Sequence, residues 1–207
     1  GIDWDIEGVN DLMSPNNVIS HACFTLVGEL SLRAKASGYV VTMVPPQSYL
    51  DLTNEKADLS LRHVSECMPS FHFAGENAYA ALLAKYNAST FDLVSVQLYE
   101  TWCKINCAVR QNATSKGATT AQILADTIRS YIDGGFVDFA ASVPELGLPS
   151  QRVSVRPDQL VIGFSFGAGS LHGRSLYINP QDFAKAYAML PAALRPRGAM
   201  FWNLELD

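Results

Sequence analysis

The sequence is poor in charged residues, and its charges do not gather by sign. Of its 207 residues 17% are charged, and 15 Lys and Arg against 20 Asp and Glu give a net charge of −5. No Lys/Arg cluster forms the basic stripe with which a nucleic-acid binder follows phosphates, so we expect no nucleic-acid partner. No apolar run reaches the roughly 20 residues that cross a membrane, so we expect no membrane partner.

Cysteine and histidine are also scarce, and their spacing predicts no metal site. The Cys103–Cys107 spacing has no Cys/His pair near it, which argues against zinc, and the four histidines are scattered. We therefore expect no metal and no cofactor. The four cysteines allow two disulfides, one of which could join Cys103 to Cys107. Cys23 fits equally well as a core residue on the apolar face of a helix.

Two glycosylation sequons are present, Asn87-Ala-Ser89 and Asn112-Ala-Thr114. Such sequons carry glycans on the surface loops of secreted proteins. They indicate a secreted, extracellular glycoprotein.

Apolar residues are abundant: 48% of the sequence is hydrophobic and 10% aromatic, which is enough for the core of a globular domain without internal linkers. Short apolar runs predict strands at residues 1–6, 39–44, 91–99, 159–166 and 198–206. Helical spacing predicts helices at residues 18–30, 76–86, 119–132 and 180–190. The apolar stripe of the first helix comprises Val18, Ile19, Ala22, Cys23, Leu26, Val27 and Leu30. This alternation predicts a parallel α/β sheet that is covered on both faces.

The first eight residues, "GIDWDIEG", place three acids in a segment that otherwise has the pattern of a buried strand. Because successive side chains of a strand point to opposite faces, Asp3, Asp5 and Glu7 share one face at intervals of about 6.6 Å. If that face is open, the acids are simply solvated. In a covered sheet they lose water and raise one another's pKa, which costs stability and is typical of working sites.

These residues carry a resemblance to the family 18 glycoside hydrolases. "GIDWDIEG" resembles the last three acidic positions of the signature Asp-x-x-Asp-x-Asp-x-Glu, on the fourth strand of a (β/α)8 TIM barrel. "VTMVP", "SVQLYE", "LVIGFSFGAG" and "GAMFWNLELD" resemble the fifth to eighth strands, in order. Gln97 and Tyr99 match the Gln-x-Tyr of one branch, and Trp202 matches a tryptophan of the last strand. Glu100 departs from that branch, which often has Asn there.

The resemblance implies a fold that residues 1–207 form only in part. They correspond to strands four to eight of one catalytic barrel domain, and the first Asp of the signature would precede Gly1. Five strands cannot close a sheet that needs eight, so we expect an upstream segment with strands one to three to complete the fold.

The resemblance also implies an activity, the retaining hydrolysis of β-1,4-linked N-acetylglucosamine in chitin or its oligosaccharides. Glu7 would protonate the glycosidic oxygen, while the substrate's own acetamido oxygen attacks the anomeric carbon. Asp5 would hold the acetamido N–H, and Asp3 would share a proton with Asp5.

Four further residues complete the implied site. Tyr99 would orient the acetamido group, Trp202 would form the floor beneath the sugar, and Gln97 and Met43 would line the pocket. Met43 fits core packing better than binding, and Tyr99 and Trp202, considered apart from the acids, also fit the core better than a site.

Two alternatives to a chitinase remain open. One is a catalytically silent, lectin-like relative that binds chitin, although such relatives typically replace the acid that is Glu7 here. The other is an endo-β-N-acetylglucosaminidase that acts on N-glycans by the same chemistry.

Overall fold

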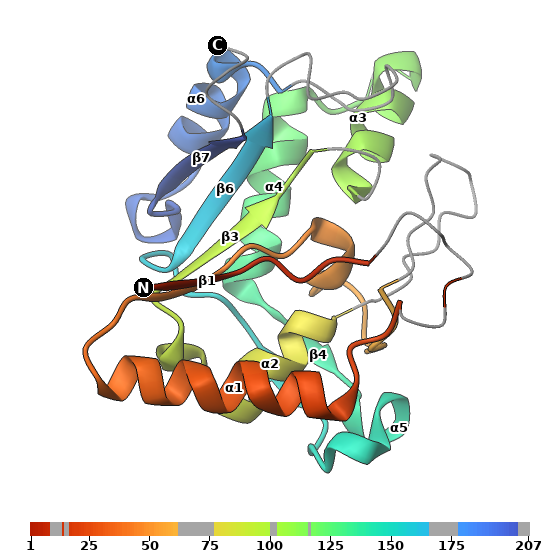
Figure 1. Cartoon of the computed structure of the whole chain (residues 1–207). Helices are drawn as coiled ribbons and strands as arrows, with labels where there is room; N and C mark the ends of the chain where they lie inside the picture. Colours follow the sequence, from red (N-terminus) through yellow and green to blue (C-terminus); the bar gives the residue numbers. More distant parts are fainter. Residues whose placement is uncertain are drawn as a thin grey trace.

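The computed structural model describes residues 1–8, 14, 17–61, 77–99, 103–115, 117–165 and 178–202. Within these residues a five-stranded sheet has the order β1-β2-β3-β6-β7. Its strands are β1 Ile2–Trp4, β2 Val41–Met43, β3 Leu93–Gln97, β6 Leu160–Ser165 and β7 Gly198–Trp202. Every neighbouring pair is parallel, as the sequence predicts. Figure 1 shows β1 near the N-terminus and β7 at the other edge, beside α6.

Helices alternate with these strands, which makes the fold a mixed α/β fold with a mostly parallel sheet. The helices are α1 His21–Ala36, α2 Ala78–Tyr86, α3 Lys104–Ser115, α4 Thr120–Asp133, α5 Phe139–Ser142 and α6 Pro180–Met189. Short 3-10 turns lie at η1 Gln47–Tyr49, η2 Ala88–Thr90, η3 Pro144–Leu146 and η4 Ala192–Leu194. The four predicted helices are confirmed, whereas α3 and α5 were not predicted.

A second, two-stranded sheet was not predicted either. It pairs β4 Gly135–Val137 with β5 Gln151–Val153 in antiparallel fashion. Three-residue strands carry too few apolar positions for a period of two to be recognised.

Local sequence signals fix the ends of α4. Thr119 and Gln122 form a capping box, in which each side chain accepts from the backbone N–H of the other residue. The helix ends at Gly134, whose φ of +67° lies in the left-handed region that favours glycine. The predicted end of this helix is confirmed.

The buried face of α1 differs from the predicted stripe. The buried residues are Phe24, Val27, Gly28, Ser31 and Ala34. Leu26 and Leu30 of the predicted stripe are 60% and 40% exposed, and Val18 and Ile19 precede the helix. Small residues occupy this face because α1 lies close to α2: a Cβ atom at Gly28 would lie 2.0 Å from the Tyr86 ring. The apolar-stripe prediction for this helix is therefore wrong in part.

The helices pack on the sheet face that carries Trp4 and Phe164. Trp4 donates from its indole Nε1 to Ser31 Oγ of α1 at 2.8 Å, and the Phe164 ring lies 5.2 Å from that of Phe183 in α6. Asp3 and Asp5 point to the other face and are exposed. The sequence predicted that both faces of the sheet are covered. Among the described residues, helices cover the face of Trp4 and Phe164, and the face of Asp3 and Asp5 is not shown to be covered.

Candidate active site

The register of the sheet decides which side chains share a face with the acids. Asp3 pairs with Thr42, and Thr42 with Leu93, so alternation places Gln97 on the same face. Gln97 pairs with Gly163, and the same alternation leads through Ser165 to its partner Trp202. We call this the acidic face; it carries Asp3, Thr42, Leu93, Ser95, Gln97, Val161, Gly163, Ser165, Gly198, Met200 and Trp202.

One buried amide brings two of the acids together. Gln97 Nε2 lies 3.0 Å from Asp5 Oδ1, 2.9 Å from Glu7 Oε1 and 2.8 Å from the carbonyl oxygen of Val44. The side chain comes from the middle of the sheet and is only 3% exposed. The amide therefore donates to both acids and holds them next to each other.

Gly163 keeps the space beside this amide free. It is the register partner of Gln97 on β6. A Cβ atom there would lie 3.0 Å from Val96 O and 3.3 Å from the Cα of Gln97. A larger residue would press on the strand that carries the amide.

The environment of Asp5 shifts its titration upward. Partial burial of the carboxyl, in a residue that still reaches solvent, raises the pKa of Asp5, and the charge of Asp3 raises it further, whereas hydrogen bonds with Glu7 and Gln97 lower it. The net shift of the Asp5 pKa is upward. The protonated form of this carboxyl is therefore favoured more than in a free aspartate.

Two contacts of the segment that carries the acids were not predicted from the sequence. Thr42 donates its hydroxyl to Asp3 Oδ1, and the hydroxyl of Tyr79 in α2 contacts the backbone of Ile6. A polar Thr within the apolar run "YVVTMV" is a signal that could have been followed. Tyr79 lies in an apolar helix segment, where nothing in the sequence separates it from other core aromatics.

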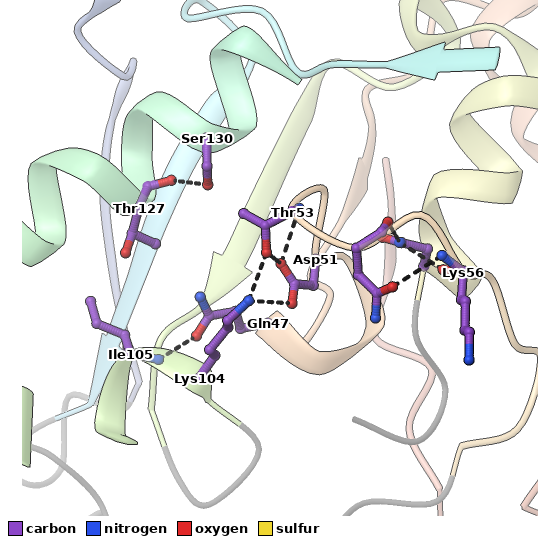
Figure 2. A network of polar contacts seen from close by, with 10 residues as sticks. Gln47, Asp51, Thr53, Lys56, Lys104, Ile105, Thr127 and Ser130 are labelled. Atoms are coloured by element: carbon purple, nitrogen blue, oxygen red, sulfur yellow. Dashed lines mark hydrogen bonds and ion pairs between the residues drawn. The ribbon is translucent and has the colours of Figure 1, made fainter. Parts of the chain in front are cut away.

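A polar network joins the segment that follows β2 to the start of α3 (Figure 2). Lys104 Nζ donates to Asp51 Oδ2 at 3.2 Å and to Thr53 Oγ1 at 2.7 Å. Gln47 Oε1 accepts from the backbone N–H of Ile105 at 2.9 Å. The network joins the start of α3 to the segment after η1.

The end of β3 is held by a thiol. Cys103 is buried and forms no disulfide, and its Sγ donates to the carbonyl oxygens of Gln97 and Tyr99 at 3.2 and 2.8 Å. Because Cys103 is not disulfide-bonded, the disulfide suggested between Cys103 and Cys107 is wrong. The loop between them is the first turn of α3, where Cys103 turns its thiol toward β3.

The remaining predicted residues, Tyr99, Trp202 and Met43, differ in exposure and in the face of the sheet on which they lie. Tyr99 follows β3 and is 6% exposed, and Trp202 lies on the acidic face of β7, 53% exposed, at the other edge of the sheet from β1. Met43 is fully buried in the core, on the face opposite Thr42. The prediction that Met43 lines the pocket is therefore not supported; β2 presents Thr42 on that face.

Two pockets of about 370 and 380 Å³ are lined by other residues. The first lies beside the Asp51–Lys104 network, between that network and α4. The second lies between α2 and β5, next to Lys85 and Arg152. Within the described ranges no group of three or more His, Cys, Asp or Glu side chains could hold a metal ion. Among these same residues no helix is long and apolar enough to cross a membrane.

The solved structures that are similar to this chain include a chitinase. The chain aligns over 100% of its length with a family GH18 chitinase from Chromobacterium violaceum, with a TM-score of 0.59 and 19% sequence identity, and it spans 50% of that chain. A second match is the C-terminal domain of Legionella pneumophila ChiA, with a TM-score of 0.46, 14% identity and coverage of 100% of this chain and 60% of that one. No protein-family model and no curated protein matches the sequence. At such identities the likeness to the chitinase is one of fold.

Proposed function

We propose that the protein is a glycoside hydrolase of the family 18 type, which cleaves β-1,4-linked N-acetylglucosamine chains with retention. The observation that carries this proposal is the contact of one buried amide, Gln97 Nε2, with both Asp5 and Glu7. Folding alone does not require a polar side chain inside an apolar strand to hold two acids together, because an apolar residue would fill that place without desolvating charges. The chitinase-like fold supports the same conclusion.

Glu7 is the proposed proton donor. Its proton passes to the glycosidic oxygen as the bond from that oxygen to the anomeric carbon breaks. The acetamido oxygen of the substrate bonds to the anomeric carbon and gives an oxazolinium ion, so no protein nucleophile is needed. Water then attacks the same carbon as its bond to the acetamido oxygen breaks and the acetamido group is restored, and the Glu7 carboxylate takes up a proton of that water.

Asp5 is the proposed partner of the acetamido group. It accepts the acetamido N–H and balances the positive charge of the oxazolinium ion. Its raised pKa fits a carboxyl that can hold a proton, and the charge of Asp3, which accepts from the Thr42 hydroxyl, contributes to that rise. Tyr99 orients the acetamido oxygen, and Trp202 provides an apolar floor on the same face.

The proposed fold is a part of a (β/α)8 barrel, within one catalytic domain that includes residues 1–207. Five parallel strands alternate with helices that pack on one face, which is the arrangement of successive barrel units. The acidic face then faces the barrel interior, and strands outside this segment complete the closure.

A secreted location is proposed with the activity, since chitin is an extracellular polymer. Asn87 of the first sequon is exposed, at a turn before η2.

The test is hydrolysis by the full-length protein, with Glu7→Gln as the matched variant. The Gln side chain keeps the volume of Glu and cannot donate the proton, so chito-oligosaccharide turnover should fall by about three orders of magnitude or more while binding remains. Products from chitotetraose and from an N-glycoprotein are identified by mass. Cleavage of chitotetraose by the parent but not by Glu7→Gln supports the proposal.

Three other outcomes of the same experiment would contradict it. Binding of chitotetraose without cleavage by the parent indicates a lectin-like protein. Cleavage of the glycoprotein alone indicates an endo-β-N-acetylglucosaminidase. Equal turnover by the parent and by Glu7→Gln removes Glu7 from the mechanism.

A further inference from the structure

A side chain from a distant helix holds the backbone between the two central acids. The hydroxyl of Tyr79, in α2, accepts from the backbone N–H of Ile6 at 2.7 Å and donates to the carbonyl oxygen of the same residue at 3.1 Å. Ile6 stands between Asp5 and Glu7. Its N–H belongs to the peptide that follows Asp5, and its carbonyl belongs to the peptide that precedes Glu7.

This backbone needs such a partner because it lies beyond the sheet. Strand β1 ends at Trp4, whose carbonyl oxygen accepts the backbone N–H of Val44 at 2.8 Å. A backbone N–H and C=O removed from water both require partners, and a phenol hydroxyl is one of the few groups that can donate and accept at once. Tyr79 thus takes the place of the next rung of the ladder.

The start of α2 is itself fastened. Asn77, at the N-cap of the helix, is fully buried with a φ of 56°, and its Nδ2 donates to the carbonyl oxygens of Asn54 and Lys56 at 2.8 and 2.9 Å. Tyr79 follows two residues later and is itself 0% exposed. A side chain on a fastened helix, locked by packing, holds its target within narrow limits.

The hydroxyl also keeps its proton. Burial raises the pKa of Tyr79 well above its usual range; the hydrogen bond with Ile6 lowers it, and the charges of Asp5 and Glu7 raise it. The phenol therefore stays a donor while the acids beside it titrate.

We propose that Tyr79 is a positioning residue, which sets the separation and orientation of Asp5 and Glu7 by clamping both peptide units of Ile6. The expected effect of Tyr79 on turnover rests on the proposed function. Its expected effect on the positions of Asp5 and Glu7 rests on the geometry alone. Tyr79 touches neither substrate nor acid side chain in this role; it acts through the backbone.

The test is Tyr79→Phe, with Tyr86→Phe as the matched control. Tyr86 is on the same helix and is buried to 6% exposure, and its ring packs on Phe24 at 5.9 Å, away from Ile6. Three quantities are measured in both variants and the parent: deuterium exchange of the Ile6 amide, the titration of the Asp5 carboxyl by NMR, and kcat and KM with chitotetraose.

The clamp predicts a defined pattern of changes. In Tyr79→Phe the Ile6 amide exchanges faster, the Asp5 pKa falls toward its ordinary value as water enters, and kcat falls by about 10- to 100-fold with little change in KM. The ladder amides of β2 keep their protection. In Tyr86→Phe the Asp5 titration and kcat stay near those of the parent, whatever the loss of thermal stability.

The same data separate this inference from the proposed function. If Asp5 titration and Ile6 exchange respond equally to the two substitutions, the positioning role is overturned, even where the parent is active. If the parent turns over no substrate, the proposed function fails, and the two backbone and carboxyl readouts still decide the clamp. If Tyr79→Phe does not fold, Ile6 exchange in the parent decides: protection equal to the β2 amides supports the clamp, and exchange as fast as a loop amide overturns it.

Discussion

At the scale of the residue, Gln97 faces more acceptors than its amide can serve. Nε2 carries two hydrogens, and three acceptors lie within 3.0 Å of it: Asp5 Oδ1, Glu7 Oε1 and Val44 O. The hydrogen bond between Asp5 and Glu7 needs a proton on one of the two carboxyls, because ionised carboxylates only accept. The shortage of donors therefore favours a shared proton, and the two acids are expected to titrate as a coupled pair.

The substitution Gln97→Leu tests this shortage. Leu has a similar size but cannot donate, so the hydrogen bond that lowers the Asp5 pKa is lost and this pKa rises further. We expect the acid limb of the pH–rate profile to move to higher pH and kcat to fall by about 100-fold. Gln159→Leu is the control: its Nε2 is buried too, but donates to the carbonyl oxygen of Ala88 at 2.6 Å, outside the site. A profile that shifts equally in both variants would contradict the assignment.

The raised pKa of Asp5 also predicts how stability depends on pH. Between the ordinary value of 3.8 and the raised value, the folded protein binds more protons than the unfolded chain, so the parent loses stability as pH rises through this window. Asn at position 5 does not titrate, so the Asp5→Asn variant lacks this loss of stability. The free energy of unfolding of Asp5→Asn, relative to that of the parent, should therefore increase from acid to neutral pH, while its turnover is lost. Urea unfolding at several pH values measures the difference, and Asp158→Asn, at an exposed carboxylate, is the control. Parallel curves for the parent and Asp5→Asn would argue against the raised pKa.

The sequence allowed prediction of the acids and of Gln97, but not of what holds them. Alternation along a strand indicated that Asp3, Asp5 and Glu7 share a face, and the structure joins the last two through Gln97. Tyr79 could not be predicted because its partner is a backbone group 73 residues away, and a backbone group leaves no mark in the sequence. Met43 was assigned to the pocket from its strand, whereas register turns it to the core.

At the scale of the element, the strands and most helices followed from apolar patterns, and the failures have physical causes. The stripe of α1 was predicted from large apolar residues, but a close helix–helix contact selects small ones, so Gly28, Ser31 and Ala34 face inward and Leu26 faces outward. The position of α3 depends on long-range contacts such as Lys104 with Asp51. Helix propensity alone does not indicate such contacts.

The Asp51–Lys104 contact gives a prediction at this scale. Asp51 is only 4% exposed and also accepts from the backbone N–H and the hydroxyl of Thr53, at 3.2 and 2.6 Å. Truncation by Asp51→Ala leaves these donors without their acceptor, which we expect to lower the free energy of unfolding by about 1–3 kcal/mol. Asp158→Ala removes a carboxylate from the exposed pair with Arg156 and should cost under about 1 kcal/mol. Equal unfolding midpoints in urea for the two variants would contradict the role of Asp51 as an anchor.

At the scale of the whole molecule, the two ends of the proposed site lie on opposite edges of one sheet. Strand β1 leads to Asp5 and Glu7, and β7 ends at Trp202, with β2, β3 and β6 between them. Four strand spacings amount to about 19 Å in a flat sheet. One sugar can meet both the acids and the Trp202 ring only if the acidic face is strongly concave, as the interior of a barrel is. The proposed role of Trp202 therefore requires the proposed barrel fold.

Fluorescence quenching of Trp202 tests this link. The measurement uses the full-length protein with the substitutions Trp4→Phe and Trp102→Phe, so that Trp202 is the remaining tryptophan among residues 1–207. Because Trp202 is 53% exposed, acrylamide should strongly quench its fluorescence. Chitotetraose bound through Asp5 should then cover the ring and lower the quenching constant, by about twofold or more if one face of the indole stacks on the sugar. Glu7→Gln should show the same protection, because it keeps binding without turnover. Chitotetraose that binds by calorimetry yet leaves Trp202 equally accessible would show that β7 does not reach the sugar, and that the sheet does not curve around it.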